Sequence, residues 1–490
     1  ELTYDVWAER IDRLANALAS LGVGRGDRVA YLGENYPSFL ETLFAAGTLG
    51  AVFVPLNTRL AAPEIAFALE DSGATVLIAS ATLEPLAVAG SRGTAVRTLA
   101  RVQDGPAADA ERRGDLEAID YDALLAGGEP AHPDVAVDLE DLAIILYTSG
   151  TTGKPKGAML THGNLTWNAV NVLTDFDVTS RTRALMIAPM FHVASLGMGA
   201  LPTLLKGGTL VLEPRFEPGR VLELIERYGI TSMSGVPTTY QMLAEHPDWD
   251  RADLSTVQIL TCGGSAVPTR VLDAYEARGL RIGMGYGMTE TSPGATALPA
   301  RYSREKQGSA GLPHFHTAVR VVDPAGDVCG PGEIGEIQVQ GPNVISAYWN
   351  RPDATAEAFE QAEDGTWLRT GDMGYRDEDG FLFISDRLKD MIISGGENIY
   401  PAQVEQVIGQ LEAVAAVAVI GVPDERWGEV PRAVVVVREG HELTEGQVIA
   451  HLDGKLARYK IPKTVVFTDE MPRTASGKIR KPDLRQRFGG

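Results

Sequence analysis

A run of glycines, hydroxyl residues and lysines carries the clearest chemical signal in the sequence. It follows the apolar residues 142–146 and reads Tyr-Thr-Ser-Gly-Thr-Thr-Gly-Lys-Pro-Lys-Gly over residues 147–157. Glycines let backbone N–H groups turn towards an anion, hydroxyls donate further hydrogen bonds, and lysines supply positive charge. The run therefore predicts a loop that binds phosphate at the end of a buried strand. The loop residues expected to bind are Thr148, Ser149, Gly150, Thr151, Thr152, Gly153 and Lys154.

The spacing in this loop differs from that of a Walker P-loop. Its glycines and lysine follow the pattern Gly150-x-x-Gly153-Lys154, and Pro155 stands where a Walker loop requires Ser or Thr. A Gly/Thr turn without a ligand is the simpler interpretation of such a run taken alone. The two lysines after a buried strand favour the anion site.

Two acidic residues lie on turns where their carboxylates can serve a nucleotide. Glu290 follows Thr289 in the glycine-rich segment 285–291, and a hard oxygen ligand beside phosphates is a common way to hold Mg²⁺. Asp372 follows Thr370 and a glycine, and its carboxylate can accept hydrogen bonds from both ribose hydroxyls. Taken alone, each residue has a simpler interpretation, as a surface glutamate on a turn and as a cap or turn residue.

Five motifs occur in a fixed order, and together they resemble a known family. They are similar to the motifs of the adenylate-forming superfamily, whose members include acyl-CoA synthetases, luciferases and peptide-synthetase adenylation domains. The resemblance covers essentially the whole chain and is strongest to the fatty acyl-CoA synthetases. The motifs are residues 147–157, Gly-Tyr-Gly-Met-Thr-Glu-Thr at 285–291, Thr-Gly-Asp at 370–372, the segment 386–398, and Pro-Arg-Thr-Ala-Ser-Gly-Lys at 472–478.

The resemblance implies that the first four motifs bind ATP and Mg²⁺. In the family pattern, Glu290 and Thr151 serve the metal, and Thr289 contacts phosphate. Tyr286 is implied to lie along the adenine. Taken alone, the glycines after residue 262 are an ordinary strand-to-helix turn. The other residues implied to bind the nucleotide are Asp372, Arg387, Gly263, Gly264, Gly285 and Gly287.

Three further matches imply two successive reactions. Lys478 would contact the substrate carboxylate and the α-phosphate during adenylation, where a positioned cation stabilises the charge of the transition state. Lys389 matches the hinge about which a small C-terminal domain rotates. Gly395 and Gly396 match the loop that lines the pantetheine tunnel of CoA. A solvated basic tail and a plain hairpin turn are the simpler interpretations of Lys478 and of the two glycines.

His192 is similar to the residue that gates the acyl pocket in the family, although a lone His beside apolar residues is more often a core residue. The pocket around it is expected to be roomy and apolar, and the absence of Lys or Arg disfavours a dicarboxylic acid. Met284 stands where plant-type relatives often have a polar residue. His314 and His316 stand where the family usually has a Gly-Pro type turn, and we expect no metal at these two histidines. The expected pocket residues are Ala194, Gly197, Met198, Thr238, Thr239, Tyr240, Gly287 and Met288.

Alternating helix and strand patterns must position these motifs. Residues 5–21 have apolar side chains at helical spacing, and the segments 27–32, 51–56 and 75–78 are typical of buried strands with helices between them. A second alternation spans 141–300. This pattern predicts an α/β fold with parallel sheets and outer helices.

After residue 300 the pattern changes to paired strands and then to a small α+β unit. We predict a large N-terminal domain over 1–386, made of two α/β subdomains plus a β-rich region. A small mobile α+β C-terminal domain over 387–490 follows, with the hinge near Lys389. Residues 101–140 are rich in Ala, Gly, Asp and Pro and are expected to form a surface connection.

The composition excludes several classes of function. The 490 residues include 44 Lys and Arg and 65 Asp and Glu, so the net charge is −21. This charge argues against general nucleic-acid binding and disfavours docking on anionic membranes. No stretch of about 20 apolar residues predicts a membrane span. Cys262 and Cys329 lie far apart and form no CxxC motif, so we do not expect a disulfide framework. We expect a reducing, cytoplasmic location.

The resemblance therefore implies an ATP-dependent carboxylic acid:CoA ligase. A hydrophobic acid, whether fatty, aryl or alicyclic, would be activated as acyl-AMP and transferred to CoA, with Mg²⁺ as the metal. Two alternatives are a ligase that stops at acyl-AMP and a member that catalyses one half-reaction only. An alternative of another class is a non-catalytic nucleotide-binding sensor. A homodimer is expected only from the family.

Overall fold

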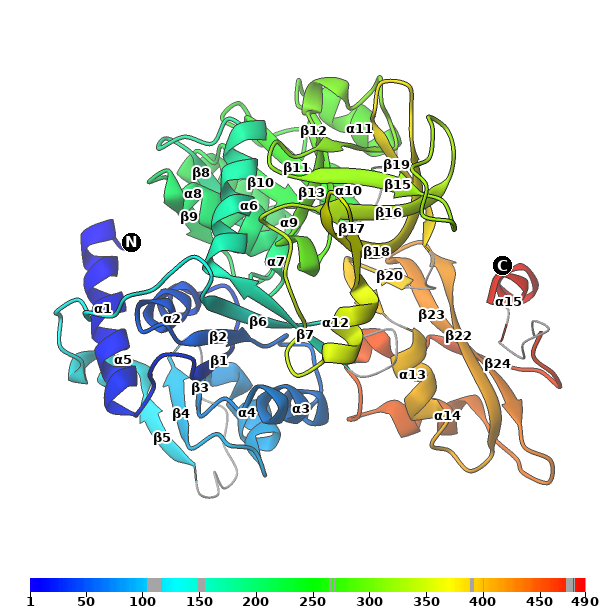
Figure 1. Cartoon of the computed structure of the whole chain (residues 1–490), viewed down its shortest axis with the longest axis horizontal. Coiled ribbons are helices and arrows are strands. Elements are labelled where there is room, and N and C mark those ends of the chain that lie inside the picture. The colour runs from blue at the N-terminus through cyan, green and yellow to red at the C-terminus, as the bar shows by residue number, and fades with distance from the viewer. Residues whose placement is uncertain are drawn as a thin grey trace.

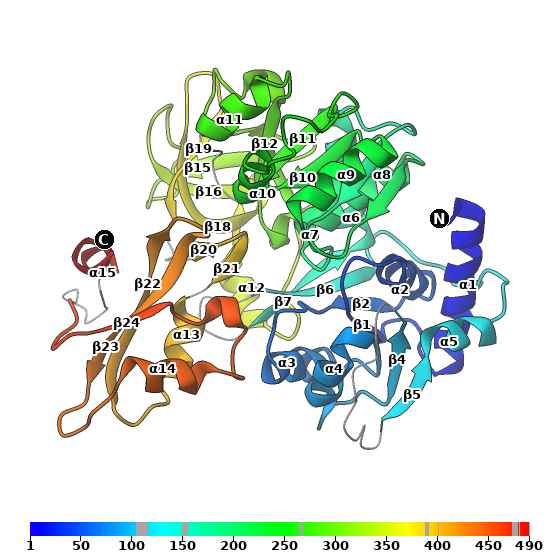
Figure 2. The ribbon, with the colours of Figure 1, turned by 180° about the vertical axis from the view of Figure 1, so that it is seen from behind.

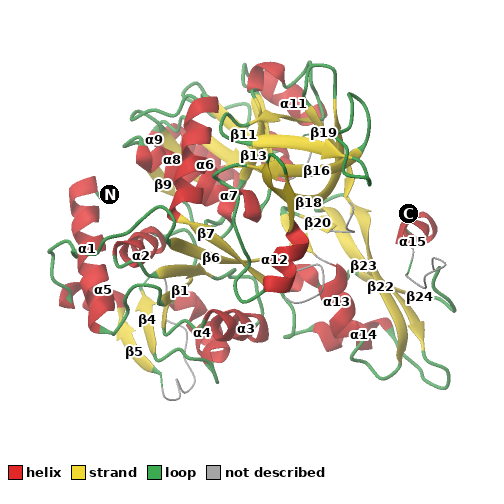
Figure 3. Ribbon diagram, viewed as in Figure 1, coloured by secondary structure: helices red, strands yellow, loops and turns green. Residues whose placement is uncertain are grey.

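Three sheets organise the chain (Figure 1). The computed structural model describes residues 1–103, 116–148, 155–263, 267, 269–387, 392–399, 401–472, 479 and 481–489. Figure 2 shows the same ribbon from behind, and Figure 3 separates helices from strands. The first two sheets belong to the N-terminal part, and the third belongs to the last hundred residues.

The first sheet has seven strands in the order β5-β4-β3-β1-β2-β6-β7. It is parallel except for β7, which runs antiparallel to β6. All residues of β2 and β3 are buried, as expected for parallel strands covered by helices on both faces. The strands are β1 (Arg28–Leu32), β2 (Val52–Pro55), β3 (Val76–Ser80), β4 (Thr98–Val102), β5 (Glu117–Asp120), β6 (Leu142–Thr148) and β7 (Lys156–Thr161).

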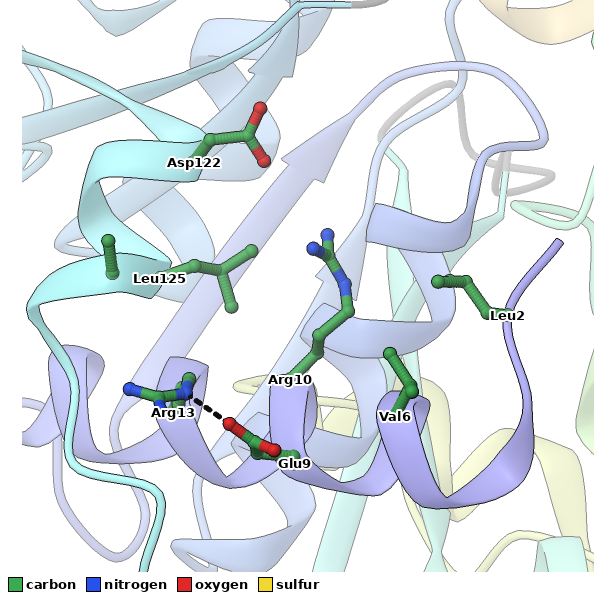
Figure 4. A pocket seen from close by; sticks show the side chains of 8 residues that line it. Leu2, Val6, Glu9, Arg10, Arg13, Asp122 and Leu125 are labelled. Atoms are coloured by element: carbon green, nitrogen blue, oxygen red, sulfur yellow. Dashed lines mark hydrogen bonds and ion pairs between the residues drawn. The ribbon is translucent and has the colours of Figure 1, made fainter.

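Helices cover this sheet and leave a groove at one edge. The groove has a volume of about 550 Å³ and lies between α1 and α5 (Figure 4). None of the five motifs lines it, and its arginines are held by carboxylates, Arg10 by Glu41 and Arg13 by Glu9. The groove is therefore not the candidate active site. The helices are α1 (Tyr4–Ser20), α2 (Pro37–Thr48), α3 (Ala62–Ser72), α4 (Glu84–Ser91) and α5 (Tyr121–Gly127).

The second sheet has twelve strands and joins the second α/β half to the β-rich region. Its parallel part runs in the order β12-β11-β10-β8-β9, and β13 and β14 continue it through antiparallel pairs to β19, β18, β16 and β15. The parallel strands are β8 (Arg183–Met186), β9 (Thr209–Leu212), β10 (Ser232–Gly235), β11 (Ile259–Gly263) and β12 (Ile282–Gly287). The others are β13 (Gly294–Leu298), β14 (Ser309–Pro313), β15 (Ala318–Val322), β16 (Gly335–Gln340), β17 (Phe359–Ala362), β18 (Gly365–Arg376) and β19 (Leu382–Arg387).

The helices of this region lie against the second sheet and beside the first. α6 follows β7 directly and is capped by Thr161, whose hydroxyl accepts a hydrogen bond from the Asn164 backbone N–H. The helices are α6 (His162–Asp175), α7 (Val193–Ser195), the π-helical turn 196–200, α8 (Leu201–Leu205), α9 (Pro218–Tyr228), α10 (Pro237–Ala244), α11 (Thr269–Glu276) and α12 (Pro352–Ala358).

The last hundred residues form a small α+β unit with its own sheet and core. The strand order is β21-β20-β23-β22, and β24 pairs with β23. Its hydrophobic clusters include Val419, Val448 and Leu452 on one face and Val434, Met471 and Leu484 on the other. The elements are β20 (Ile392–Ser394), β21 (Glu397–Ile399), α13 (Pro401–Ile408), β22 (Val414–Asp424), β23 (Gly428–Val437), α14 (Glu445–Leu452), β24 (Thr464–Phe467) and α15 (Lys481–Phe488).

The architecture confirms the predicted fold class. The first α/β alternation, the second alternation and the hairpin turning at 379–380 all occur where the sequence predicts them. Residues 116–127 differ, since they form β5 and α5 where a surface connection was expected. Within the described residues, the helices are all too short or too polar to cross a membrane.

Candidate active site

Two motifs that lie far apart in the sequence meet through one hydrogen bond. The hydroxyl of Tyr286, near the carboxyl end of β12, donates to Oδ2 of Asp372 on β18 at 2.8 Å. The backbone N–H of Asp372 donates to the Thr370 hydroxyl at 3.1 Å and closes a tight turn. Gly371, in the middle of this turn, has a φ of 70°, which favours glycine. The residues implied to contact adenine and ribose are therefore neighbours. Arg387 lies opposite Asp372 in the β18–β19 register, although its side chain is outside the described part.

Glu290 is a buried carboxylate held by a tyrosine. It lies with Thr289 in the short turn after β12, and its Oε1 accepts a hydrogen bond from the Tyr348 hydroxyl at 2.6 Å. The backbone oxygen of Glu290 also accepts from the Ile345 N–H at 2.9 Å. A buried carboxylate is costly unless it is hydrogen-bonded or paired with a cation. These contacts therefore fix Glu290 in place.

Lys156 joins the same cluster from the phosphate-binding motif. Its ammonium lies 5.1 Å from the centre of the Tyr348 ring. Tyr348 forms an isolated β-bridge with Ala158 of β7, and the backbone N–H of Trp349 donates to the Gly157 backbone oxygen at 2.7 Å. Sequence reasoning missed Tyr348; the only signal was a pair of adjacent aromatic residues in a polar segment.

The predicted phosphate-binding loop follows one strand of an antiparallel pair and precedes the other. Thr148 ends β6 and Lys156 begins β7, and the two residues are register partners. The Thr148 hydroxyl is 3.4 Å from the Lys156 oxygen. This strand-to-strand connection differs from the strand-to-helix connection of a P-loop, in agreement with the spacing. The predicted residues Ser149, Gly150, Thr151, Thr152, Gly153 and Lys154 lie outside the described residues.

Glycines keep side chains away from the carboxyl ends of β11 and β12. Gly263 and Gly285 are register partners on these adjacent strands, and a Cβ on either would lie 3.6 Å from a backbone oxygen, at ordinary van der Waals distance. A side chain at Gly287 is excluded by packing, because a Cβ on this residue would lie 1.7 Å from the Pro293 backbone oxygen. Gly264, the remaining predicted glycine of this group, lies outside the described residues.

His192 lies at the junction with the small domain. Its Nε2 is 3.2 Å from Oε2 of Glu397, which begins β21. Arg59 donates from Nη1 to Oε1 of the same carboxylate at 2.5 Å. Burial raises the pKa of the Glu397 carboxyl, but the positive charges of His192, Arg59 and Lys460 outweigh burial and bring this pKa to about 2. Glu397 therefore carries its charge at neutral pH.

The two glycines before Glu397 also reach the N-terminal part. A Cβ on Gly396 would lie 3.3 Å from the Val236 side chain, which immediately precedes α10. Gly395 donates its N–H to the Trp427 oxygen at 2.9 Å, and its missing Cβ makes room for the Trp427 ring. Both glycines have positive φ values, 56° and 83°. The structure thus brings the predicted tunnel loop next to His192.

The neighbourhood of His192 is only partly as expected. Gly197 packs against Pro293, since a Cβ there would lie 2.7 Å from the proline ring. Tyr240, expected around the pocket, is instead fully buried in a core cluster, and its hydroxyl donates to the Thr261 oxygen at 2.6 Å. The Thr238 side chain lies outside the described part.

The histidine pair near residue 315 has a structural explanation. His314 is buried and bonds the Asp175 carboxylate through Nδ1, and the ring of His316 meets Trp167 edge-on at 5.0 Å. Within the described ranges, no group of three or more His, Cys, Asp or Glu side chains could hold a metal ion. These contacts give both histidines a role in packing.

Two predicted lysines, Lys389 and Lys478, lie outside the described residues. The described neighbours of the second one lie on the small domain. Met471 and Ile479 pack with Leu484 of α15 in one hydrophobic cluster on β22 and β23. In both ribbon views α15 lies at the edge of the molecule, whereas β12 and β18 do not (Figures 1 and 2).

Comparisons with known proteins match both parts of the chain. Residues 1–349 match the family model of AMP-binding enzymes, and residues 403–478 match the model of the AMP-binding enzyme C-terminal domain. The chain is 52% identical to a feruloyl-CoA synthase from an Amycolatopsis species, with 100% of this chain and 94% of the relative covered. It is 45% identical to an indoleacetate–CoA ligase from Aromatoleum aromaticum, with 99% and 93% covered.

One solved protein matches in two liganded forms. The o-succinylbenzoate-CoA synthetase MenE from Bacillus subtilis is 34% identical in both cases, and each match covers 99% of this chain and 93% of that one. The TM-score is 0.86 for a double mutant bound with the product analogue OSB-NCoA. It is 0.70 for the complex with the acyl-adenylate intermediate OSB-AMP. By TM-score, the overall structure of this chain is therefore more similar to the complex with OSB-NCoA than to the complex with OSB-AMP.

Proposed function

The chain belongs to the family of AMP-binding enzymes and is an acid–CoA ligase, and we propose that its acid substrates are aromatic. The observation that carries this proposal is full-length identity to ligases named for two aromatic acids, at 52% and 45%.

In the first step, we propose that the acid displaces pyrophosphate from ATP. A carboxylate oxygen attacks the α-phosphorus, the bond to the β-phosphate oxygen breaks, and pyrophosphate leaves. Asp372 and Tyr286 would hold ribose and adenine, a role supported by their 2.8 Å contact. Lys478 would stabilise the charge that gathers on the α-phosphate. The outcome is acyl-AMP, whose carbonyl is activated for the second step.

We also propose that Glu290, together with Thr151, serves Mg²⁺. The fixed position of the Glu290 carboxylate supports this role, because a hard oxygen ligand beside phosphates is what Mg²⁺ prefers. When bound, the ion would neutralise phosphate charge during adenylation. Tyr348 would orient the carboxylate through its hydrogen bond to Oε1.

In the second step, the thiol of CoA would attack the acyl carbonyl, the acyl–oxygen bond to AMP would break, and the thiol proton would be released. The position of Gly395 and Gly396 near Val236 and His192 supports a narrow channel for pantetheine at this junction. The higher TM-score with the OSB-NCoA complex supports the same assignment for the arrangement described here.

We further propose that the two steps use two arrangements of the domains 1–386 and 387–490, with a hinge near Lys389. The change of sheet supports this boundary, since β19 ends the second sheet at residue 387 and β20 begins the third at 392. Gly396 packs against Val236 of the N-terminal part, whereas Met471 and Ile479, the described residues near Lys478 in sequence, pack with Leu484 of α15, which lies at the edge of the molecule in both ribbon views (Figures 1 and 2). A rigid domain would therefore have to rotate to use both.

A panel of acids tests the proposed substrate class. Thioester formation from ATP, Mg²⁺ and CoA would be compared for ferulate, cinnamate, indole-3-acetate, octanoate and palmitate. We expect kcat/KM for the best aromatic acid to exceed that for both fatty acids by roughly tenfold or more, the effect of one or two well-filled contacts. Equal or higher kcat/KM for a fatty acid would overturn the aromatic assignment and leave the ligase assignment intact.

Trp427 is expected to contribute to CoA binding. Its ring is 39% exposed, lies over Gly395, and has the Arg426 guanidinium 4.7 Å from its centre. An exposed aromatic ring can stack on the adenine of CoA, a contact that contributes about 1–3 kcal/mol. Trp427→Ala should therefore raise the KM for CoA about tenfold and leave acyl-AMP formation unchanged.

Phe467 provides the matched control for Trp427. It is a similarly exposed aromatic residue of the same sheet, but it pairs with Val435, whereas Ser394, the residue before the glycine loop, pairs with Gly428 at the start of β23. Phe467→Ala should leave the KM for CoA within twofold of the wild-type value. An unchanged KM in Trp427→Ala, or an equal rise in both variants, would rule out the stacking role.

A further inference from the structure

Two ion pairs with buried carboxylates join the domains, and the acid of each pair comes from a different domain. Glu64, in the first turn of α3, pairs with Lys460 of the small domain, with 2.8 Å between Oε1 and Nζ. Glu397 of the small domain pairs with Arg59 of the N-terminal domain at 2.5 Å. Each domain thus supplies one acid and one base. We refer to these two contacts as the crossed pairs.

The Glu64–Lys460 pair is the more deeply buried of the crossed pairs. Only 9% of Glu64 and 3% of Lys460 are exposed to solvent, whereas the Arg59 side chain is about half exposed. Lys460 ends a short 3₁₀ turn, 458–460, in the small domain. Both ribbon views place α3 beside this domain (Figures 1 and 2).

Glu64 serves both domains with one carboxylate. Its Oε2 accepts the Ala61 N–H at 3.0 Å, which caps the start of α3. The same oxygen accepts the Ala457 N–H of the small domain at 3.1 Å. Glu64 is therefore held rigidly by its own helix and presents a fixed acceptor to the small domain.

We propose that Glu64 and Lys460 are positioning residues that select the arrangement used for thioester formation. The inference rests on the proposed function, because it assumes that the two half-reactions use different arrangements. Lys460 does not touch the reacting atoms; it acts by holding the domain that carries Gly395, Gly396 and Glu397 next to His192.

The energetics of buried ion pairs suit a contact that forms and breaks in every cycle. The desolvation of two charges largely offsets their attraction, so an intact pair adds little net stability. When the domains separate, both groups regain water, whereas a large apolar contact would resist separation. Removal of one partner is different, because the remaining charge is then buried without compensation. A single substitution should therefore strongly disfavour this one arrangement.

The test measures the two half-reactions separately in Lys460→Met. Adenylation is followed by acid-dependent ATP–pyrophosphate exchange, and thioester formation by single-turnover reaction of supplied acyl-AMP with CoA. We expect thioester formation to slow by roughly 30-fold or more, and exchange to stay within about twofold of wild type. Retained exchange also shows that the variant is folded.

Three further variants separate positioning from a general structural role. Lys463→Met removes an exposed lysine three residues further along and should leave both half-reactions unchanged. Lys460→Arg keeps the charge and should retain most of the thioester-forming rate. Glu64→Gln combined with Lys460→Met leaves no unpaired charge and should recover part of the loss seen in Lys460→Met.

The outcomes distinguish this inference from the proposed function. Equal slowing of both half-reactions in Lys460→Met, or unchanged thioester formation, would overturn the positioning role while the ligase assignment stands. If the wild-type protein itself forms no thioester from any acid, the proposed function fails and this inference fails with it.

Discussion

Glu290→Gln is expected to slow acyl-adenylate formation by roughly 100-fold, the typical effect of removing one group that stabilises charge in a transition state. The substitution removes the negative charge that we assign to Mg²⁺ but keeps the size of the side chain. The glutamine oxygen can still accept the hydrogen bond from Tyr348, so the local fold should persist. The loss should therefore report on the metal rather than on packing.

The dependence on Mg²⁺ concentration makes this first prediction specific. ATP–pyrophosphate exchange, measured across a Mg²⁺ series, should need more Mg²⁺ in Glu290→Gln than in the wild type. Calorimetric titration of Mg²⁺ into the ATP-bound variant should show weaker binding. Glu305→Gln, at an exposed glutamate, is the control and should behave as wild type. An unchanged rate and an unchanged Mg²⁺ requirement in Glu290→Gln would exclude the assigned role.

Lys478→Ala is expected to have the largest effect, a loss of roughly 1000-fold in adenylation. The reason is that a cation placed on the α-phosphate stabilises charge that exists only in the transition state. Thioester formation from supplied acyl-AMP should change by no more than a few fold, because the neighbours Met471 and Ile479 pack in a cluster with Leu484 of α15, which lies at the edge of the molecule in both ribbon views.

The two lysine variants should give opposite patterns. Lys478→Ala should lose the first half-reaction and keep the second, whereas Lys460→Met should keep the first and lose the second. Lys463→Ala is the control for loss of a lysine from the same domain and should keep both. Parallel loss of both half-reactions in Lys478→Ala would mean that its effect is not confined to adenylation, and the assigned role would be wrong.

The elements of the fold could be predicted where apolar spacing alone determines them. The strands β1, β2 and β3 of the first sheet are buried and mainly apolar, and the sequence pattern predicts them for that reason. The elements β5 and α5 were missed because Ala, Gly and Asp dominate that region. The one local signal was Asp120, whose side chain caps α5 by accepting the Asp122 and Ala123 N–H groups at 3.0 and 3.1 Å.

The contacts that make the site depend on tertiary structure, and sequence patterns do not encode them. The role of Asp372 could be inferred from its motif, but its hydrogen bond to Tyr286 requires two strands 86 residues apart to lie together. Tyr348 belongs to no motif, and tertiary contacts, the bridge to β7 and the Ile345 N–H bond to the Glu290 oxygen, bring it to Glu290. The Glu64–Lys460 pair joins residues 396 positions apart across a domain junction. Periodicity and spacing report local structure and cannot report such distances.

The acidic character of the chain is compatible with a site for polyanions. The net charge of −21 belongs to the whole molecule and does not decide the charge of a local site. Lys156 lies against Tyr348 next to Glu290, and Arg59 faces Glu397, so each cation meets an acid from a distant segment of the chain.

The balance of products in one reaction shows whether this chain catalyses both half-reactions. The protein is incubated with an aromatic acid, ATP and Mg²⁺, with and without CoA, and pyrophosphate, acyl-AMP, AMP and thioester are quantified. We expect bound acyl-AMP and pyrophosphate without CoA, and equal amounts of thioester, AMP and pyrophosphate with CoA. Acyl-AMP that persists in the presence of CoA, thioester formed only from supplied acyl-AMP, or bound ATP without any product would contradict this expectation.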